Sequence, residues 1–140
     1  MPSSCPASSS ARSQEGTSYH YAPPEVDLHT HPGLNRRILD VAGALGIDLI
    51  AGKHWTTDAL YRETFSKLER LGARGVLSVD MELSALAGVA HYRGCDLSAL
   101  LVVTDVASRS HTWADASAQL AQGAERAAQI AARLFLPDHP

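Results

Sequence analysis

Segments with helical periodicity alternate with short apolar runs along most of this chain. Helical spacing of apolar side chains occurs in residues 33–46, 61–71, 81–94 and 113–135. Apolar runs between these segments predict strands at residues 47–51, 76–79 and 97–103. The last run is long enough in apolar residues to be buried on both faces. The alternation predicts an α/β fold, a truncated three-layer α/β/α sandwich with a mostly parallel or mixed sheet.

Glycines stand where several of the predicted helices should end. Gly46 and Gly94 follow the first and third helical segments, and Gly72 with Gly75 follows the second. Residues 56–58, Thr-Thr-Asp, are expected to form a turn or a helix cap ahead of the second segment. In the third helix, the expected buried stripe contains Met81, Ala85, Leu86 and Val89.

The amino-terminal region has a different composition. Residues 1–15 are rich in Ser, Pro and Ala and lack periodicity, so we expect a disordered leader. Residues 16–32 contain several prolines and should be extended or looped. The globular part is therefore expected at residues 16–136, as one domain.

Composition excludes several classes of partner. The formal net charge of −3 gives no broad basic surface for nucleic acid, so small molecules are the expected partners. No apolar run reaches the length of about 20 residues that a membrane helix needs, which favours a cytoplasmic location. Cys5 and Cys95 lie in unlike contexts, so no disulfide is expected, and Cys95 is predicted to be a small buried side chain.

Acidic residues follow two of the predicted strands. Met81-Glu82 comes just after the strand at 76–79, and Thr104-Asp105 follows the strand at 97–103. The carboxyl ends of parallel strands are where α/β proteins bind ligands. Structural alternatives exist for each acid, because Asp80 and Glu82 also suit a helix amino terminus and Asp105 also suits a loop. We interpret Asp80 as a helix cap.

Other polar residues give weaker indications. His29 and His31 lie near His20, but no cysteine or acid at ligand spacing completes a metal site, and we predict none. Ser84 has no His–Asp pattern beside it, so a serine nucleophile is not indicated. Arg109 follows Asp105 closely and either polarises that acid or lies in a loop.

Four motifs in a fixed order resemble the carboxyl-terminal half of the nucleoside phosphorylase family, which includes purine nucleoside phosphorylase, uridine phosphorylase and methylthioadenosine nucleosidase. They are GTSYHY at residues 16–21, WTTDALYRET at residues 55–64, VDMELSAL at residues 79–86 and LVVTDVAS at residues 101–108. The resemblance covers nearly all of residues 11–135 and implies the three-layer α/β/α fold of that family.

The resemblance also implies roles for particular residues. Met81 packs under the ribose, and Glu82 accepts hydrogen bonds from the sugar 2′ and 3′ hydroxyls, which suits the two oxygens of a carboxylate. Asp105 protonates or hydrogen-bonds N7 of the departing base, neutralising the charge that bond cleavage leaves there. Leu60 and Tyr61 line the base pocket, where Leu60 replaces a frequent aromatic residue.

Further positions carry lesser implied roles. Thr104 lies beside the base, and His20 and Arg109 are possible contributors to the pocket. Uridine-specific members have a Gln and an Arg between the aromatic segment and the VDME-like strand, whereas residues 62–75 contain Arg but no Gln. A purine substrate is therefore favoured.

The implied reaction is transfer of a pentosyl group from a nucleoside to phosphate, with phosphate as co-substrate and with no organic cofactor or metal. The family's glycine-rich phosphate site lies in the amino-terminal half, and residues 1–15 contain no counterpart. A phosphate-independent nucleosidase, a non-catalytic remnant and one half of a split enzyme remain as alternatives. The expected partners are a nucleoside and phosphate, together with further copies of the chain or a complementary amino-terminal half.

Overall fold

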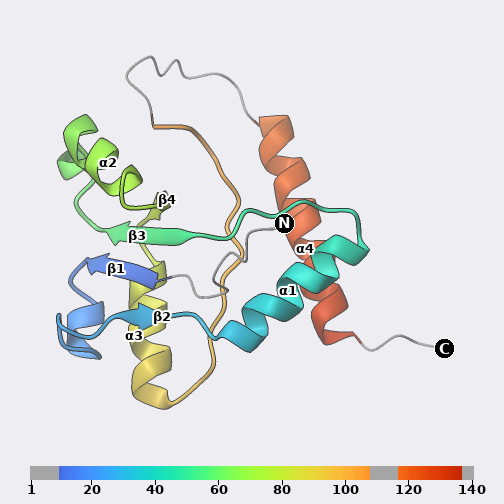
Figure 1. Ribbon diagram of the computed structural model, residues 1–140, viewed down its shortest axis with the longest axis horizontal. Helices are drawn as coiled ribbons and strands as arrows, with labels where there is room; N and C mark the ends of the chain where they lie inside the picture. Colours follow the sequence, from blue (N-terminus) through green and yellow to red (C-terminus); the bar gives the residue numbers. More distant parts are fainter. Residues whose placement is uncertain (1–9, 108–116, 137–140) are drawn as a thin grey trace. The chain divides into compact units, whose positions relative to one another are not determined.

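The computed structural model describes residues 10–107 and 117–136 (Figure 1). The chain divides into two compact units, residues 1–35 with 51–99 and residues 36–50 with 100–140. All strands of the described residues belong to the first unit. None of the helices within the described ranges has the length and apolar character needed to cross a membrane.

The first unit is built on a mixed four-stranded sheet with the order β2-β1-β3-β4. The strands are β1 (Ser10–Gln14), β2 (Leu28–His29), β3 (Lys53–Thr57) and β4 (Val76–Asp80). β1 runs parallel to β3, β3 runs parallel to β4, and only the short β2 is antiparallel to its neighbour. The expected α/β fold with a mixed, mostly parallel sheet is confirmed.

Helices α2 (Phe65–Gly72) and α3 (Leu83–Arg93) cover opposite faces of this sheet. Successive residues of a strand point to opposite faces. On β3, Trp55 contacts Lys67 of α2, whereas the next residue, Thr56, bonds to Ser84 of α3. The first unit alone therefore has a helix layer on each side of its sheet.

The apolar core of the first unit is small. Ala22, Leu28 and Ala87 form a buried cluster between α3 and the β2 side of the sheet, with Val26 and Leu97 packed against it. On the other face, the Trp55 side chain is 1% exposed. Much of the remaining interior of this unit is polar, which becomes important for the site.

Helices α1 (Pro32–Ala44) and α3 end as the glycines predict. Gly46 has a φ of 67° and Gly94 a φ of 65°, the left-handed conformation that glycine adopts without steric cost. After Gly46, the Ile47 N–H donates to the Ala42 carbonyl at 2.8 Å, and Cys95 bonds in the same way to Ala90 at 2.9 Å. Both ends are Schellman motifs, which satisfy the last carbonyls of a helix.

The second unit contains most of α1 and helix α4 (Ser117–Phe135). Ile130 of α4 and Ala42 of α1 are its buried apolar side chains, and the Arg37 guanidinium donates to the Leu134 carbonyl at 3.2 Å. A Cβ at Gly123 would lie 2.6 Å from Val102 Cγ1, so glycine permits close approach of α4 to residues 100–107. The predicted start of this helix, at Trp113, lies outside the described residues.

The expectation of a disordered leader over residues 1–15 was wrong for its last six residues. Residues 10–14 form β1 inside the sheet, and Glu15 is buried. The segment is mostly polar, and its backbone pairs with β2 on one side and β3 on the other. Residues 1–9 lie outside the described ranges.

The strand predicted at residues 47–51 is also absent, and β3 begins two residues later, at Lys53. Its sequence, KHWTT, is mostly polar, and the expectation of a turn or a helix cap at residues 56–58 is wrong for Thr56 and Thr57. Both threonines are instead buried in the strand. The strand was missed because hydrogen bonds, rather than an apolar surface, satisfy the side chains on one of its faces.

Residues 97–103 do not form a strand, although their apolar content predicted one. A strand requires a partner, and within the described ranges no strand pairs with this segment. The strand predicted at 76–79 is confirmed as β4, but Leu77 on it is exposed, so it is less buried than expected.

Three smaller expectations need correction. The buried residues of α3 are Leu83, Ser84, Ala87 and Gly88, while Leu86 and Val89 of the predicted stripe are exposed. Small residues on the buried side let the turn at Ser18 approach, since a Cβ at Gly88 would lie 3.4 Å from the Ser18 backbone. The second helical segment is split into the 3₁₀ helix η2 (Leu60–Arg62) and α2. Cys95 is exposed because it follows the end of α3.

Candidate functional site

The carboxyl ends of β1, β3 and β4 meet at one edge of the sheet because the three strands are parallel. Glu15 follows β1, Asp58 follows β3, and Met81-Glu82 follows β4. The first two of these segments are tied together, since the Gly16 N–H donates to Asp58 Oδ2 at 3.1 Å. Acidic side chains are therefore concentrated at the edge where ligands bind in α/β proteins.

The Met81-Glu82 turn connects β4 to α3. Both side chains are exposed. The Glu82 carboxylate folds back on its own turn, where its Oε2 accepts the Met81 N–H at 3.0 Å. The turn itself therefore orients this carboxylate, which the resemblance assigns to the sugar.

A buried polar cluster lies under this turn. Thr56 Oγ1 donates to Asp80 Oδ1 at 2.8 Å and accepts the Ser84 N–H at 3.0 Å. Asp80 Oδ2 accepts the Leu83 N–H at 3.1 Å, which supports its interpretation as a cap of α3. The buried His54 ring has Nδ1 2.7 Å from Ser78 Oγ and Nε2 2.8 Å from Asp80 Oδ1, the latter without hydrogen-bond alignment.

Glu15 extends the cluster to β1. Its carboxylate accepts the Thr17 N–H at 2.6 Å, the Ser18 N–H at 2.7 Å and the Ser84 hydroxyl at 2.9 Å. Burial alone raises the pKa of Glu15, but the hydrogen bonds from Ser18, Ser84 and Thr17 outweigh burial and bring the pKa below its ordinary value. The ionised carboxylate thus holds the end of β1 against the first turn of α3.

Leu60 and Tyr61 lie on η2, which follows β3, so they belong to the same edge as Met81 and Glu82. Tyr61 is 97% exposed, leaving its ring face open. Nearby on α2, Lys67 Nζ lies 4.2 Å from the centre of the Trp55 ring. Burial, together with the charges of Arg62 and Arg70, lowers the pKa of Lys67.

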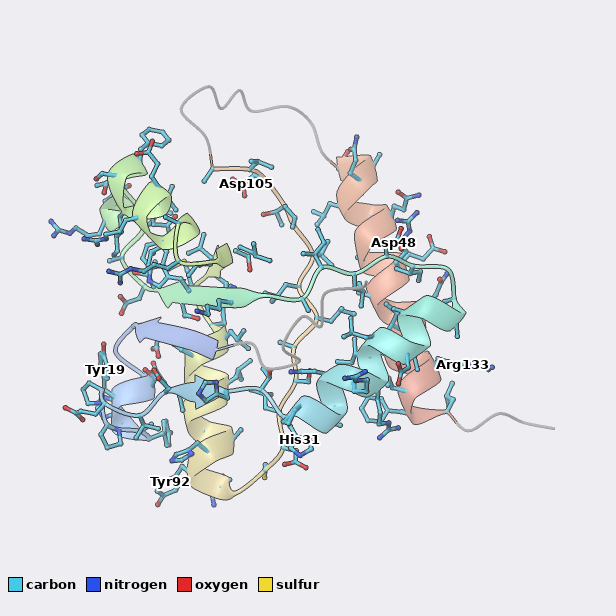
Figure 2. All side chains as sticks on the ribbon, in the orientation of Figure 1. Tyr19, His31, Asp48, Tyr92, Asp105 and Arg133 are labelled. Carbon is cyan, nitrogen blue, oxygen red and sulfur yellow. The ribbon has the colours of Figure 1, made fainter. Side chains whose placement is uncertain are left out.

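The other predicted site residues are divided between regions. His20 is exposed at the end of the 3₁₀ helix η1 (Ser18–His20) in the first unit. Thr104 and Asp105 belong to the second unit, where the Thr104 hydroxyl donates to Asp105 Oδ1 at 3.1 Å and both side chains are exposed. Asp105 is labelled in Figure 2. Arg109 lies outside the described residues. Leu60 and Tyr61 therefore follow β3, and Met81 and Glu82 follow the neighbouring strand β4, at the same edge of the sheet. The roles assigned to these four residues, and to Thr104, Asp105 and Arg109, remain predictions.

Sequence reasoning missed Glu15, His54 and Thr56. Glu15 and Ser84 are 69 residues apart in the chain, and Thr56 and Asp80 are 24 apart, so no local pattern links them. The one available indication was the polar sequence of β3, in which hydrogen-bonding side chains alternate with Trp55.

His31, just before α1, has two side-chain contacts. His31 Nδ1 accepts the Leu34 N–H at 3.2 Å, at the start of α1, and its Nε2 lies 3.8 Å from Asp96 Oδ1. Over residues 10–107 and 117–136, no three or more His, Cys, Asp or Glu side chains gather in a metal-binding group.

Acids after neighbouring parallel strands lie at the sheet edge where α/β proteins commonly bind their ligands. The family model described as the Phosphorylase superfamily matches residues 6–136, so this chain belongs to that superfamily of nucleoside phosphorylases and nucleosidases. The match begins ten residues before the predicted boundary at residue 16, in agreement with the position of β1.

Curated relatives support the same family. DeoD-type purine nucleoside phosphorylases of Bacillus cytotoxicus and Bacillus thuringiensis are each 33% identical over 72 residues. The aligned region is 51% of this chain and 31% of each relative. The chain thus corresponds to about a third of the length of the curated relatives it matches.

Solved structures are similar over a larger part of the chain. AMP nucleosidase from Bacteroides thetaiotaomicron has a TM-score of 0.58 and 25% identity, covering 87% of this chain and 50% of that one. Purine nucleoside phosphorylase from Toxoplasma gondii, in complex with immucillin-H, has a TM-score of 0.51 and 24% identity, covering 64% and 38%. The second similarity concerns the fold alone.

Proposed function

We propose that this chain supplies the sugar- and base-binding part of a nucleoside phosphorylase that acts on a purine nucleoside. The observation that carries the proposal is the position of Met81-Glu82, directly after β4 and at the same sheet edge as Leu60 and Tyr61. An acid at that edge suits a nucleoside substrate, because the two oxygens of a carboxylate can accept hydrogen bonds from both hydroxyls of a ribose diol.

The proposed reaction exchanges one bond at the sugar for another. The C1′–N9 bond breaks, its electron pair goes to the base, and a phosphate oxygen forms the new bond to C1′ through an oxocarbenium-like state. Asp105 donates a proton or a hydrogen bond to N7, which neutralises the negative charge that cleavage leaves on the base. Glu82 holds the 2′ and 3′ hydroxyls, and Met81 packs against the sugar. No group of a metal or organic cofactor takes part in these steps.

The purine preference has two supports. The matching Bacillus relatives are purine nucleoside phosphorylases by name, and residues 62–75 lack the Gln typical of uridine-specific members. Tyr61 stacks on the base, with Leu60 and Thr104 lining the pocket and His20 or Arg109 as further contributors. We propose that phosphate binding is supplied by a complementary amino-terminal half or by another copy of the chain.

A hydrolytic nucleosidase is the second candidate. It is favoured by the similarity to AMP nucleosidase, which covers more of this chain than does the Toxoplasma gondii phosphorylase. In this version water replaces phosphate as the nucleophile, and the same Glu82 and Asp105 serve the sugar and the base. A chain that binds a nucleoside without cleaving it is the non-catalytic alternative.

Base release by the purified full chain tests these candidates. Inosine, uridine and AMP are supplied with and without phosphate, to the wild type, to Asp105→Asn and to Asp48→Asn. Asp48 is an exposed acid of the same unit and provides the matched control. Where another copy of the chain supplies phosphate binding, the proposal predicts phosphate-dependent release from inosine that Asp105→Asn abolishes and Asp48→Asn retains. Phosphate-independent release supports the nucleosidase, and no release from a folded chain rules out stand-alone catalysis.

A further inference from the structure

The Thr56 hydroxyl bonds to residues on both sides of the Met81-Glu82 turn. It donates to Asp80, the last residue of β4, at 2.8 Å, and accepts the Ser84 N–H, in the first turn of α3, at 3.0 Å. The Thr56 side chain is 0% exposed. One buried hydroxyl on β3 therefore spans the turn from beneath, while the turn's own side chains face solvent.

Both residues that Thr56 joins are themselves held in place. Asp80 is also close to His54 Nε2, at 2.8 Å, and caps Leu83. Ser84 is also bonded to Glu15, whose carboxylate accepts its hydroxyl at 2.9 Å. The buried hydrogen bonds of Thr56, Asp80 and Ser84 resist displacement, because breaking one of them leaves a desolvated group without a partner. The ends of the turn are thus fixed from β1, β3 and β4.

The backbone of this turn orients the Glu82 carboxylate. Its Oε2 accepts the Met81 N–H at 3.0 Å, so a change in the turn's backbone changes where the carboxylate points. Two hydroxyl groups of a sugar can be accepted together only when both oxygens are correctly oriented.

We propose that Thr56 is a positioning residue for Glu82: its hydroxyl sets the geometry of the Met81-Glu82 turn and thereby the recognition of a vicinal diol. The proposal rests on the proposed function, in which Glu82 binds the sugar. Thr56 acts through Asp80 and Ser84 and makes no contact with substrate.

Thr56→Val is the principal variant, since valine has nearly the shape of threonine and lacks the hydroxyl. Thr56→Ser keeps the hydroxyl and should restore the wild-type behaviour. Thr30→Val is the matched control, because Thr30 is another buried threonine of the same unit and its hydroxyl accepts a bond from the Asn35 amide. Thr56→Ala leaves space for a water and serves if the valine variant does not fold.

The affinities of the full chain for inosine and for 2′,3′-dideoxyinosine are measured by calorimetry. The ratio of the two reports diol recognition alone. We expect Thr56→Val to lower the ratio of inosine affinity to dideoxyinosine affinity about tenfold, by weakening inosine binding and leaving dideoxyinosine binding unchanged. Thr56→Ser and Thr30→Val should retain the wild-type ratio. A residue with a merely structural role would weaken both ligands equally, and that outcome would overturn the proposal.

Amide hydrogen exchange of the ligand-free chain separates this inference from the proposed function. We expect the Met81 amide to exchange about tenfold faster in Thr56→Val than in the wild type or Thr56→Ser, with the Ala90 amide of α3 as an unchanged reference. If wild-type chain does not distinguish the two ligands, the assigned role of Glu82 fails, and Met81 exchange still decides whether Thr56 holds the turn. Equal exchange of the Met81 amide in the wild type and all variants would overturn the proposal that Thr56 holds the turn. The proposal would also be overturned if Thr56→Val and Thr56→Ala both fail to fold while Thr56→Ser folds.

Discussion

Residues 76–82 and residues 100–105 are similar runs of sequence, VLSVDME and LLVVTD, each ending in an acid. The first forms β4 in register with β3, and hydrogen bonds hold the residues on either side of its Glu82 turn. The second forms no strand, and Asp105 accepts a hydrogen bond from its own neighbour, Thr104. The position of a carboxylate is therefore determined by the elements that pair with its segment, rather than by the apolar run before it.

The largest expected effect is a difference in stability between a variant of the sheet and a variant of residues 100–105. Trp55 lies on β3, the partner of β4, and is 1% exposed, whereas Val103 is 70% exposed. Trp55→Ala should lower the free energy of unfolding by about 3–5 kcal/mol, and Val103→Ala by no more than about 0.5 kcal/mol. Denaturant unfolding of both variants measures this difference. A comparable loss in the two variants would mean that residues 100–105 are packed as firmly as β3.

The second expected effect concerns pH. Because the pKa of folded Glu15 lies below its unfolded value of 4.5, the carboxylate contributes stability above that value and loses the contribution as pH falls through the folded pKa. Glu15→Gln should cost about 1–2 kcal/mol of unfolding free energy at pH 7 and flatten the decline in stability as the pH falls below 4.5. Unfolding at a series of pH values checks the sign. If the free energy of unfolding of the variant declines with pH as that of the wild type does, Glu15 does not cause the decline.

Hydrogen exchange provides a direct measure of pairing. Amides of β4 should exchange at least about tenfold more slowly than those of residues 101–105. The reason is that β4 is hydrogen-bonded to β3, whereas none of the described strands pairs with residues 101–105. Equal protection of the two segments would show that residues 101–105 pair in solution, and the contrast between the regions would disappear.

The smallest expected effect separates binding from folding at Tyr61. Because this ring is 97% exposed, Tyr61→Ala should change the free energy of unfolding by less than about 0.5 kcal/mol. The same variant should bind inosine more weakly if the ring stacks on the base. Calorimetry and denaturant unfolding of one sample give both values, and loss of stability without loss of affinity would make Tyr61 a packing residue.

Local patterns were sufficient to predict several elements from the sequence. Gly46 and Gly94 marked true helix ends, the apolar run at 76–79 predicted β4, and the four motifs identified the family that residues 6–136 match. Each of these features depends on neighbours in the chain. Their physical causes, the conformational freedom of glycine and the burial of apolar side chains, are visible in a short window.

The parts that could not be predicted depend on partners that are distant in the chain. β3 is polar in sequence because Thr56 and His54 bond to β4 and α3, and Glu15 is buried because Ser84 and the turn at Ser18 satisfy it. Residues 97–103 have the composition of a strand, but pairing is not encoded in composition. The network under Glu82 was invisible for the same reason.

The central claim is that the end of β4 binds the sugar of a nucleoside, and calorimetric titration of inosine into the full chain tests it most directly. Wild type, Glu82→Gln and Glu25→Gln are compared, Glu25 being an exposed acid of the same unit away from β4. The account predicts binding that Glu82→Gln weakens about tenfold or more and that Glu25→Gln leaves unchanged. No binding by the wild type, or equal affinity in wild type and Glu82→Gln, would contradict it.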